Sequence, residues 1–218
     1  MSITVKRGTL SNAKTQTVVN TVNCVGAMGK GIALVFRLRY PNMYQEYKRL
    51  CSKGSIQIGK LWLYQADSGN RILNFPTKDH WKYPSKIEYL EKGLTEFLNI
   101  YKKEGINSIA FPLLGANNGG LDKGIVLNLM KEYLSRCNIP IEIYKYDPSV
   151  EDELYVKFAQ KWQLFSLQDI RSATGIRKDR IKKISEVIGD GQVNSIIDLI
   201  NVKGIGLRTM QKCFTFIQ

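Results

Sequence analysis

The chain has 218 residues, and its composition of 44% hydrophobic and 23% charged residues is that of a globular protein with a sizeable core. Its 32 Lys and Arg residues outnumber its 19 Asp and Glu residues, giving a formal net charge of +13. Such an excess favours a polyanionic partner. No apolar run approaches the roughly 18 residues of a membrane-spanning helix, so we expect no association with a membrane.

The cysteines are scattered along the chain without paired spacing. They are Cys24, Cys51, Cys137 and Cys213. This pattern predicts neither a disulfide framework nor a zinc site, and we expect no metal or other cofactor. The first residues have the pattern of a β-strand and not that of a signal peptide. The sequence therefore favours a reduced, cytoplasmic setting.

Buried strands alternate with amphipathic helices over the first two thirds of the chain. One helix stops before Pro41, another begins with a capping-box pattern at Ser85 and Glu88, and a third is capped by Asp122. The alternation predicts an α/β sandwich with a mixed sheet. The expected strands cover residues 2–7, 17–24, 60–66, 71–75, 108–114 and 141–146, and the expected helices cover residues 31–39, 43–51, 85–105 and 122–136.

Two glycine-rich loops each follow a buried strand and precede a helix. The first contains Gly26, Gly29 and Gly31, and the second spans residues 115–120. Glycines let a backbone approach a ligand closely, and the following helix N-terminus favours negative charge. The spacing fits neither a Walker loop nor the dinucleotide fingerprint. The loops therefore predict a phosphate or diphosphate site of another kind.

Four sequence motifs together resemble the macrodomain family, the ADP-ribose-binding α/β fold, over residues 1–147. The resemblance is to the DarG group of that family, which removes ADP-ribose from DNA bases modified by the toxin DarT. It implies a three-layer sandwich with a mixed sheet, and ADP-ribosylated DNA and a DarT-like toxin as partners. The motifs are Asn20-Thr21-Val22-Asn23-Cys24-Val25-Gly26, Met28-Gly29-Lys30-Gly31-Ile32-Ala33-Leu34, Asn74-Phe75-Pro76-Thr77-Lys78 and Gly119-Gly120-Leu121-Asp122.

The same resemblance implies a role for each part of the site. The adenine would lie near Gly8, Thr9 and Leu10, and the distal ribose near Thr21, Val22, Asn23 and Thr77. The diphosphate would lie against Gly29, Gly31, Ile32, Ala33 and Leu34 from the first loop and against Gly115, Ala116, Asn117, Asn118 and Gly119 from the second.

Lys78 is the residue that the resemblance assigns to catalysis. An amine at the end of an apolar strand is partly shielded from water, which favours its neutral, nucleophilic form. It would attack the anomeric carbon or the aldehyde of the opened ribose. The alternative is an ordinary surface lysine in a basic run with Lys82 and Lys86. The roles of two neighbouring residues stay open. His80 either contacts the leaving base or phosphate or is a solvated loop residue, and Trp81 either stacks on a base or packs in the fold.

Beyond residue 148 the composition changes. A linker helix carrying Phe158 and Trp162 is expected over residues 149–165, and it could dock on the macrodomain. Residues 166–218 predict a small all-α region with a helix-turn-helix or a degenerate helix-hairpin-helix. In such hairpins backbone amides and basic side chains hold DNA phosphates. The alternative is a purely structural helical cap. The candidate DNA-binding residues are Lys203, Gly204, Gly206 and Arg208.

These features predict an ADP-ribosyl glycohydrolase that removes ADP-ribose from DNA bases and reverses a DarT-like toxin. Two alternatives remain. One is a module that binds or sequesters ADP-ribose without turnover, and the other is a phosphatase or deacylase acting on free ADP-ribose derivatives.

Overall fold

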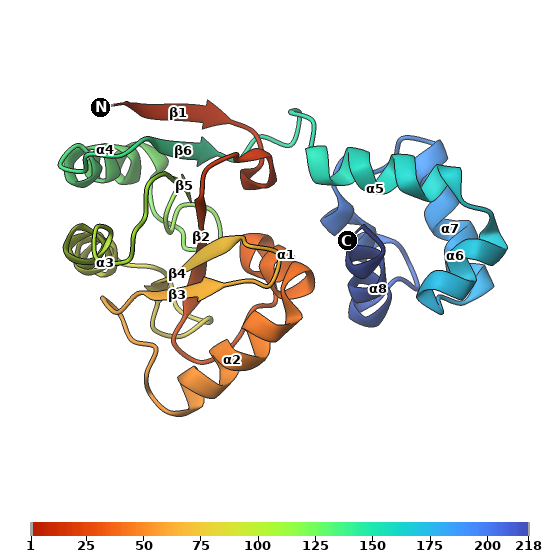
Figure 1. The fold of residues 1–218 in the computed structure, drawn as a ribbon, viewed down its shortest axis with the longest axis horizontal. Coiled ribbons are helices and arrows are strands. Elements are labelled where there is room, and N and C mark those ends of the chain that lie inside the picture. The colour runs from red at the N-terminus through yellow and green to blue at the C-terminus, as the bar shows by residue number, and fades with distance from the viewer. Residues whose placement is uncertain (1, 218) are drawn as a thin grey trace. The chain divides into compact units, whose positions relative to one another are not determined.

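The computed structural model describes residues 2–217 and divides into two compact units. The first unit ends at Tyr146 and the second begins at Asp147. Figure 1 shows the first as a sheet flanked by helices and the second as a group of helices. None of the helices within residues 2–217 is both long and apolar enough to cross a membrane.

A mixed six-stranded sheet forms the centre of the first unit, with the strand order β1-β6-β5-β2-β4-β3. In this order the first five strands, β1, β6, β5, β2 and β4, are parallel to one another, and the last strand, β3, is antiparallel to β4. The prediction of an α/β fold with a mixed sheet is thus confirmed. The strands are β1 (Ile3–Arg7), β2 (Thr17–Asn23), β3 (Trp62–Gln65), β4 (Arg71–Lys78), β5 (Ile109–Pro112) and β6 (Ile141–Lys145).

Helices cover both faces of this sheet and make a three-layer sandwich. Figure 1 shows α1 (Gly31–Arg39) and α2 (Pro41–Ser52) on one side, and α3 (Ile87–Ile100) and α4 (Lys123–Leu134) on the other. On α3, the completely buried residues Leu90, Leu94 and Phe97 follow helical spacing and pack in the same core as Phe75 and Phe111. The two faces of the sheet therefore have separate apolar cores.

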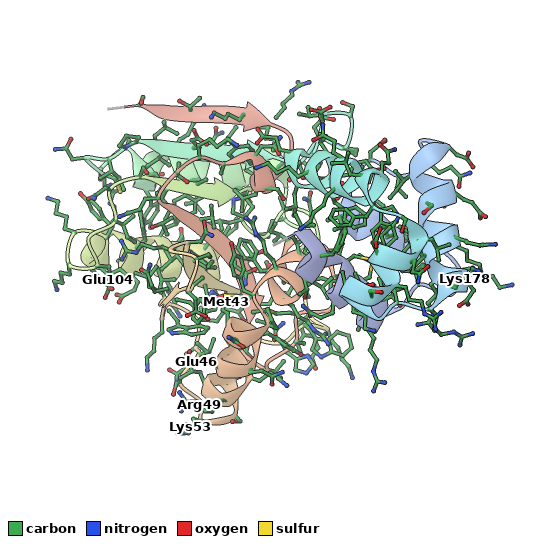
Figure 2. The ribbon with its side chains drawn as sticks, turned by 45° about the vertical axis from the view of Figure 1, so that its right-hand side comes forward. Met43, Glu46, Arg49, Lys53, Glu104 and Lys178 are labelled. Atoms are coloured by element: carbon green, nitrogen blue, oxygen red, sulfur yellow. The ribbon has the colours of Figure 1, made fainter. Side chains whose placement is uncertain are left out.

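Helix α2 shows the same division between a buried and a solvated side. Met43 is completely buried in the second core, whereas Arg49 and Lys53 are exposed. Figure 2 shows Glu46, Arg49 and Lys53 following one another along the helix away from Met43. Arg49 and Glu46 lie 3.8 Å apart, a weak surface ion pair. Burial of one stripe is therefore what holds α2 against the sheet.

Two buried asparagines fix the register between the central strands. Asn20 of β2 pairs with Asn74 of β4, and its side-chain amide donates to the side-chain oxygen Oδ1 of Asn74 at 2.9 Å. Both residues are completely buried. A slipped register would leave these amides unpaired in an apolar core, which is costly. The pair therefore determines which residues of β2 and β4 reach the edge of the sheet together.

Several predicted element ends differ from the structure. Strand β4 runs through Lys78, three residues beyond the expected end, and α3 ends at Ile100, before the expected stop at Gly105. The N-cap of α3 is Lys86, with no side-chain cap bond, so the capping box expected at Ser85 is wrong. Ser85 is instead buried, and its backbone N–H donates to the Gly119 carbonyl at 2.9 Å. A long-range contact thus replaces the local cap.

The second unit is helical. Its helix α5 was expected to be a separate linker that could dock on the macrodomain, but it packs inside this unit. Trp162 of α5 is buried, contacts the ring of Phe216 at 5.7 Å between centroids, and donates its indole N–H to Ser185 at 3.0 Å. The elements are α5 (Glu153–Leu164), α6 (Leu167–Thr174), α7 (Lys178–Gly189), the 3-10 helix η2 (Ile196–Asn201) and α8 (Leu207–Ile217).

We predict that Gly93→Ala destabilises the first unit. A Cβ added at Gly93 would lie 2.2 Å from Phe75 Cζ. The overlap should lower the free energy of unfolding by about 1–3 kcal/mol, although alanine is the better helix former by about 1 kcal/mol. Urea denaturation followed by circular dichroism measures the change. Gly189→Ala is the control, because its added Cβ meets nothing within 4 Å. Equal stability of both variants would contradict this account.

Candidate functional site

The predicted site residues gather at one edge of the sheet. Because β1, β6, β5, β2 and β4 are parallel, the loops that follow them leave from the same, carboxyl, edge. Ligands of open α/β sheets bind at this edge. It carries residues 8–10 after β1, residues 24–30 after β2, residues 79–86 after β4 and residues 113–122 after β5.

Asn23 organises the first glycine loop. Its side-chain oxygen accepts the backbone N–H groups of Val25 and Ala27 at 3.0 and 3.2 Å, and its amide donates to the Ala27 carbonyl at 2.5 Å. The Tyr47 hydroxyl donates to the Asn23 carbonyl at 2.6 Å. Asn23 is therefore buried and engaged within the loop, so it holds the site in shape. Its side chain has few bonds left for a ligand.

The end of the first loop is open for an anion. Helix α1 begins at Gly31, and its N-cap residue Lys30 makes no side-chain cap bond. The first amides of a helix lack intrahelical partners and carry partial positive charge. A Cβ added at Gly29 would meet nothing within 4 Å, so packing alone does not require glycine there. The surface around Gly29 therefore has room for a ligand.

The second glycine loop is tightly closed. Gly115 has a φ of +64°, and its carbonyl accepts the N–H of Leu121 at 3.1 Å. A Cβ added at Gly119 would lie 2.2 Å from the Gly115 oxygen. Glycine is therefore required at both positions for the loop to form. Ser85 lies against this loop, and its hydroxyl has no hydrogen-bond partner among the described residues.

Lys78 lies where the two loops meet. Its Nζ donates to the Asn118 carbonyl at 2.5 Å, and the Asn118 side-chain amide lies against Gly31 of the first loop. Lys78 is half-buried, and its neighbour Thr77 is buried. The sequence expectation of an amine at a strand end is thus met, with the amine in reach of both predicted phosphate loops.

The residues after β1 lie at the same edge, three strands away from β2. Gly8 has a φ of +126°, and its N–H donates to the Lys145 carbonyl at 3.0 Å. The Thr9 hydroxyl accepts the N–H of Ser11 at 2.9 Å and caps the short 3-10 helix η1 (Leu10–Asn12). The edge is therefore long enough for a ligand with two separated ends.

A family model described as Macro domain matches residues 19–130. The chain belongs to this family. Its macrodomain is also similar to the solved macrodomain of Mycobacterium tuberculosis DarG, with a TM-score of 0.63 and 41% identity over 66% of this chain and 97% of that one. The solved macrodomain of Thermus aquaticus DarG has the same TM-score, with 39% identity over 66% of this chain and 98% of that one.

Three curated relatives share this macrodomain. A DNA ADP-ribosyl glycohydrolase of Mycobacterium tuberculosis is 48% identical over 55% of this chain and 35% of its own length. The enzyme of that name from Thermus aquaticus is 42% identical over 65% of this chain and 40% of its own. A DNA ADP-ribosyl transferase–DNA ADP-ribosyl glycohydrolase fusion protein of Thermosipho africanus is 37% identical over 66% and 42%. The chain thus spans less than half the length of these relatives.

A cavity of about 60 Å³ lies beside η1, α1 and the first residues of β2 and β4, and its lining includes the predicted site residues Leu10 and Ile32. Pockets for drug-sized ligands have volumes of about 300–1,000 Å³. The cavity is therefore too small for a nucleotide, and the candidate site remains the carboxyl edge. Within residues 2–217, no group of three His, Cys, Asp or Glu side chains could hold a metal ion.

The helical unit contains an internal repeat that the expected helix-hairpin-helix did not reveal. Residues 166–188 and 195–217 correspond at a constant offset of 29 positions. Both copies begin with a serine N-cap, carry a positive-φ glycine followed by a buried isoleucine, and have a lysine in the second helix. The corresponding pairs are Ser166 and Ser195, Asp169 and Asp198, Gly175 and Gly204, Ile176 and Ile205, and Lys183 and Lys212.

The two copies also contact each other reciprocally. Lys183 of the first copy donates to the Lys203 carbonyl at 3.2 Å, and Lys212 of the second donates to the Gly175 carbonyl at 2.6 Å. Arg180 donates to Thr209, its own counterpart, at 3.1 Å. Such reciprocal contacts are typical of an approximate two-fold relation. The hairpin motif alone does not predict this repeat, whose signal in the sequence is the constant spacing of 29 positions.

The predicted DNA-binding residues lie in the loop of the second copy. Lys203, Gly204, Gly206 and Arg208 are all exposed, whereas Ile205 between the glycines is buried. The first copy exposes Arg177 and Lys178 in its own loop, at the positions that correspond to Gly206 and Leu207. Lys178 is the first residue of α7 and is labelled in Figure 2. Both loops thus present basic side chains to solvent.

The thiols are not candidates for a nucleophile. Burial, and then the charge of Asp79, raise the pKa of the Cys24 thiol beside the first loop to about 12. Burial likewise raises the pKa of Cys51, and raises those of Cys137 and Cys213 to about 11 and about 12. The thiolate is the reactive form, so these groups are inert near neutral pH.

We predict slow alkylation of the native protein by iodoacetamide at pH 8. With a pKa of about 12, Cys24 has about 1,000-fold less thiolate than a free cysteine at this pH, and the fraction rises as the pH increases. Mass spectrometry should find native thiols mostly unmodified and all four modified in denaturant. Rapid native modification of Cys24 at pH 8 would contradict the assigned burial.

Proposed function

We propose that this macrodomain is an ADP-ribosyl glycohydrolase that removes ADP-ribose from modified DNA bases, with Lys78 as its catalytic residue. The position of the Lys78 amine, hydrogen-bonded to Asn118 between the two glycine loops, carries the proposal. The curated relatives named DNA ADP-ribosyl glycohydrolase support it.

In this proposal ADP-ribose lies along the carboxyl edge of the sheet. Its adenine contacts Gly8, Thr9 and Leu10, and its distal ribose lies beside Thr21, Val22 and Thr77. The open amides of α1 bind one side of the diphosphate. The second loop closes over the other side. The proposed diphosphate contacts are Gly29, Gly31, Ile32, Ala33, Leu34, Gly115, Ala116, Asn117, Asn118 and Gly119.

The chemical step needs the free amine of Lys78. Its hydrogen bond to Asn118 must break, and the amine must give up a proton, before its lone pair is available. The amine then attacks the anomeric carbon of the distal ribose, the bond from that carbon to the base breaks, and the base leaves with the electron pair and gains a proton. Water displaces the lysine and releases ADP-ribose. If the ribose ring opens first, the bond from C1 to the ring oxygen breaks and C1 forms a double bond to the base nitrogen. The amine then adds to C1, the base leaves with the electron pair of its bond to C1 and gains a proton, and water hydrolyses the resulting imine of Lys78.

A DarT-like DNA ADP-ribosyl transferase is the proposed partner in the cell. The Thermosipho africanus relative joins a transferase and a glycohydrolase in one chain, which supports a coupling of the two reactions. The macrodomain would then reverse the modification that the transferase makes.

We predict that Lys78→Ala lowers the rate of ADP-ribose release from an ADP-ribosylated oligonucleotide by at least about 100-fold, because the nucleophile is lost. Its dissociation constant for free ADP-ribose should change by less than about threefold, since phosphate binding belongs to the loops. Chromatography of released ADP-ribose and titration calorimetry measure the two effects. Lys103→Ala is the control, because Lys103 is exposed and precedes Glu104, whose carbonyl accepts a hydrogen bond from Arg71 at the start of β4, the opposite edge of the sheet.

Two results would favour the alternatives. Tight binding of ADP-ribose with no release by the unsubstituted protein would indicate a binding module. Release of phosphate or an acyl group from free ADP-ribose derivatives, without action on DNA, would indicate a phosphatase or deacylase.

We further propose that the repeated hairpins of the helical unit bind DNA phosphates. The repeat favours this function over a structural cap, because the loops of both copies expose basic side chains, at different positions of the repeat. Residues 151–218 hold 11 Lys and Arg against 8 Asp and Glu, so their net charge is small. The exposed basic side chains of the two loops, and not the net charge of the unit, therefore support this proposal. Such contacts would hold DNA without reading its sequence.

We predict that the double variant Lys203→Ala, Arg208→Ala weakens binding of unmodified DNA. Two lost phosphate contacts should reduce the slope of log K against log salt concentration by about 2. Fluorescence anisotropy at several salt concentrations measures this slope. Lys157→Ala, an exposed lysine on α5, should leave it unchanged. An unchanged slope in the double variant would indicate that this hairpin is a structural cap.

A further inference from the structure

The turn that follows Lys78 exposes aromatic rings to solvent. Trp81 is 53% exposed and Tyr83 is 65% exposed. Of the two alternatives left open for Trp81, this exposure disfavours packing in the fold. Exposing large apolar rings is unfavourable in water, and exposed apolar groups that gather in one place mark binding sites. The position of these rings, a few residues from the proposed catalytic amine, makes them candidates for contact with the substrate.

The rings are held in a fixed arrangement. The backbone N–H of Tyr83 donates to the His80 carbonyl at 3.1 Å, and the N–H of Lys82 donates to His80 Nδ1 at 3.2 Å. The His80 ring stacks on Trp81, with centroids 5.6 Å apart and planes 28° apart, and lies 5.5 Å from the Tyr83 ring. Prior ordering lowers the entropic cost of binding.

Both ends of the turn are tied to the two glycine loops. The carbonyl of Asp79 accepts the N–H of Cys24 from the first loop at 3.1 Å. At the other end, the N–H of Ser85 donates to Gly119 of the second loop at 2.9 Å. The rings therefore have a set position relative to the loops and to Lys78.

We propose that residues 80–83 form a platform for single-stranded DNA, on which Trp81 and Tyr83 stack with nucleobases adjoining the modified one. Stacking suits every base, because each has a π-face. This inference rests on the proposed function, and it names the residues that contact the nucleotides on either side of the modified one. In a duplex the flanking bases are stacked within the helix and out of reach, so the platform requires unpaired nucleotides.

The charge around the turn selects nucleic acid over a protein partner. Lys82 Nζ lies 5.4 Å from the centroid of the Trp81 ring, and the exposed Lys86 follows at the end of the turn. Residues 1–150 hold 21 Lys and Arg against 11 Asp and Glu. Rings with cations between them match the alternating bases and phosphates of a single strand.

The test compares Trp81→Ala and Tyr83→Ala, each combined with Lys78→Ala so that the substrate is not consumed. Each variant should bind an ADP-ribosylated single-stranded oligonucleotide about 5-fold or more weakly than the Lys78→Ala parent. Its affinity for free ADP-ribose should stay within about twofold, because the rings lie outside the proposed ADP-ribose contacts. Trp81→Phe should retain most of the oligonucleotide affinity. Ile125→Ala, which removes another side chain that is 59% exposed, should have no effect.

Equal oligonucleotide affinity of the Trp81 and Tyr83 variants and their parent would overturn the platform. Loss of a protein partner with unchanged DNA binding would overturn it as well, in favour of a protein-docking surface. The proposed function is assayed separately, by ADP-ribose release from the protein with Lys78 intact. If release is absent but oligonucleotide binding still depends on Trp81, the platform stands and the glycohydrolase assignment fails.

Discussion

The pairing of β2 with β4 is the constraint on which the candidate site depends. The buried hydrogen bond between Asn20 and Asn74 sets its register as far as Val22 and Pro76, and an irregularity after Val22 then brings Lys78 opposite Asn23 at the ends of the strands. A shift by one residue would turn the side chains of one strand to the opposite face of the sheet. Lys78 would then leave the junction of the loops. A polar pair deep in the core thus determines the geometry of an edge several residues away.

The loops at that edge are connected to one another by hydrogen bonds and close contacts. Asn118 joins Lys78 to the first loop, Ser85 joins the turn after β4 to Gly119, and Cys24 joins the same turn to the first loop. Each contact satisfies a backbone group that the tight turns leave unpaired. The adjoining amides of α1 have no side-chain cap. The site thus combines a closed framework with an open anion-binding end.

The two units present basic groups in different ways. In the macrodomain, Lys78, Lys82 and Lys86 lie at the end of β4 and in the turn after it, beside the exposed rings of Trp81 and Tyr83. The helical unit presents them twice, through a repeated hairpin whose copies brace each other by the reciprocal bonds of Lys183 and Lys212. One arrangement suits a single modified nucleotide, and the other suits a repeating phosphate backbone.

The sequence by itself determined the order of strands and helices, the two glycine loops and the macrodomain resemblance, because hydrophobic periodicity and glycine spacing are local signals. It predicted Lys78 through the Asn-Phe-Pro-Thr-Lys motif. The tertiary structure alone decided that Ser85 supports the second loop and not a helix start, that Asn23 is engaged within its own loop and that α5 packs inside the helical unit. It also decided that Trp81 is exposed. These outcomes depend on contacts between residues far apart in the chain, about which local propensity carries no information.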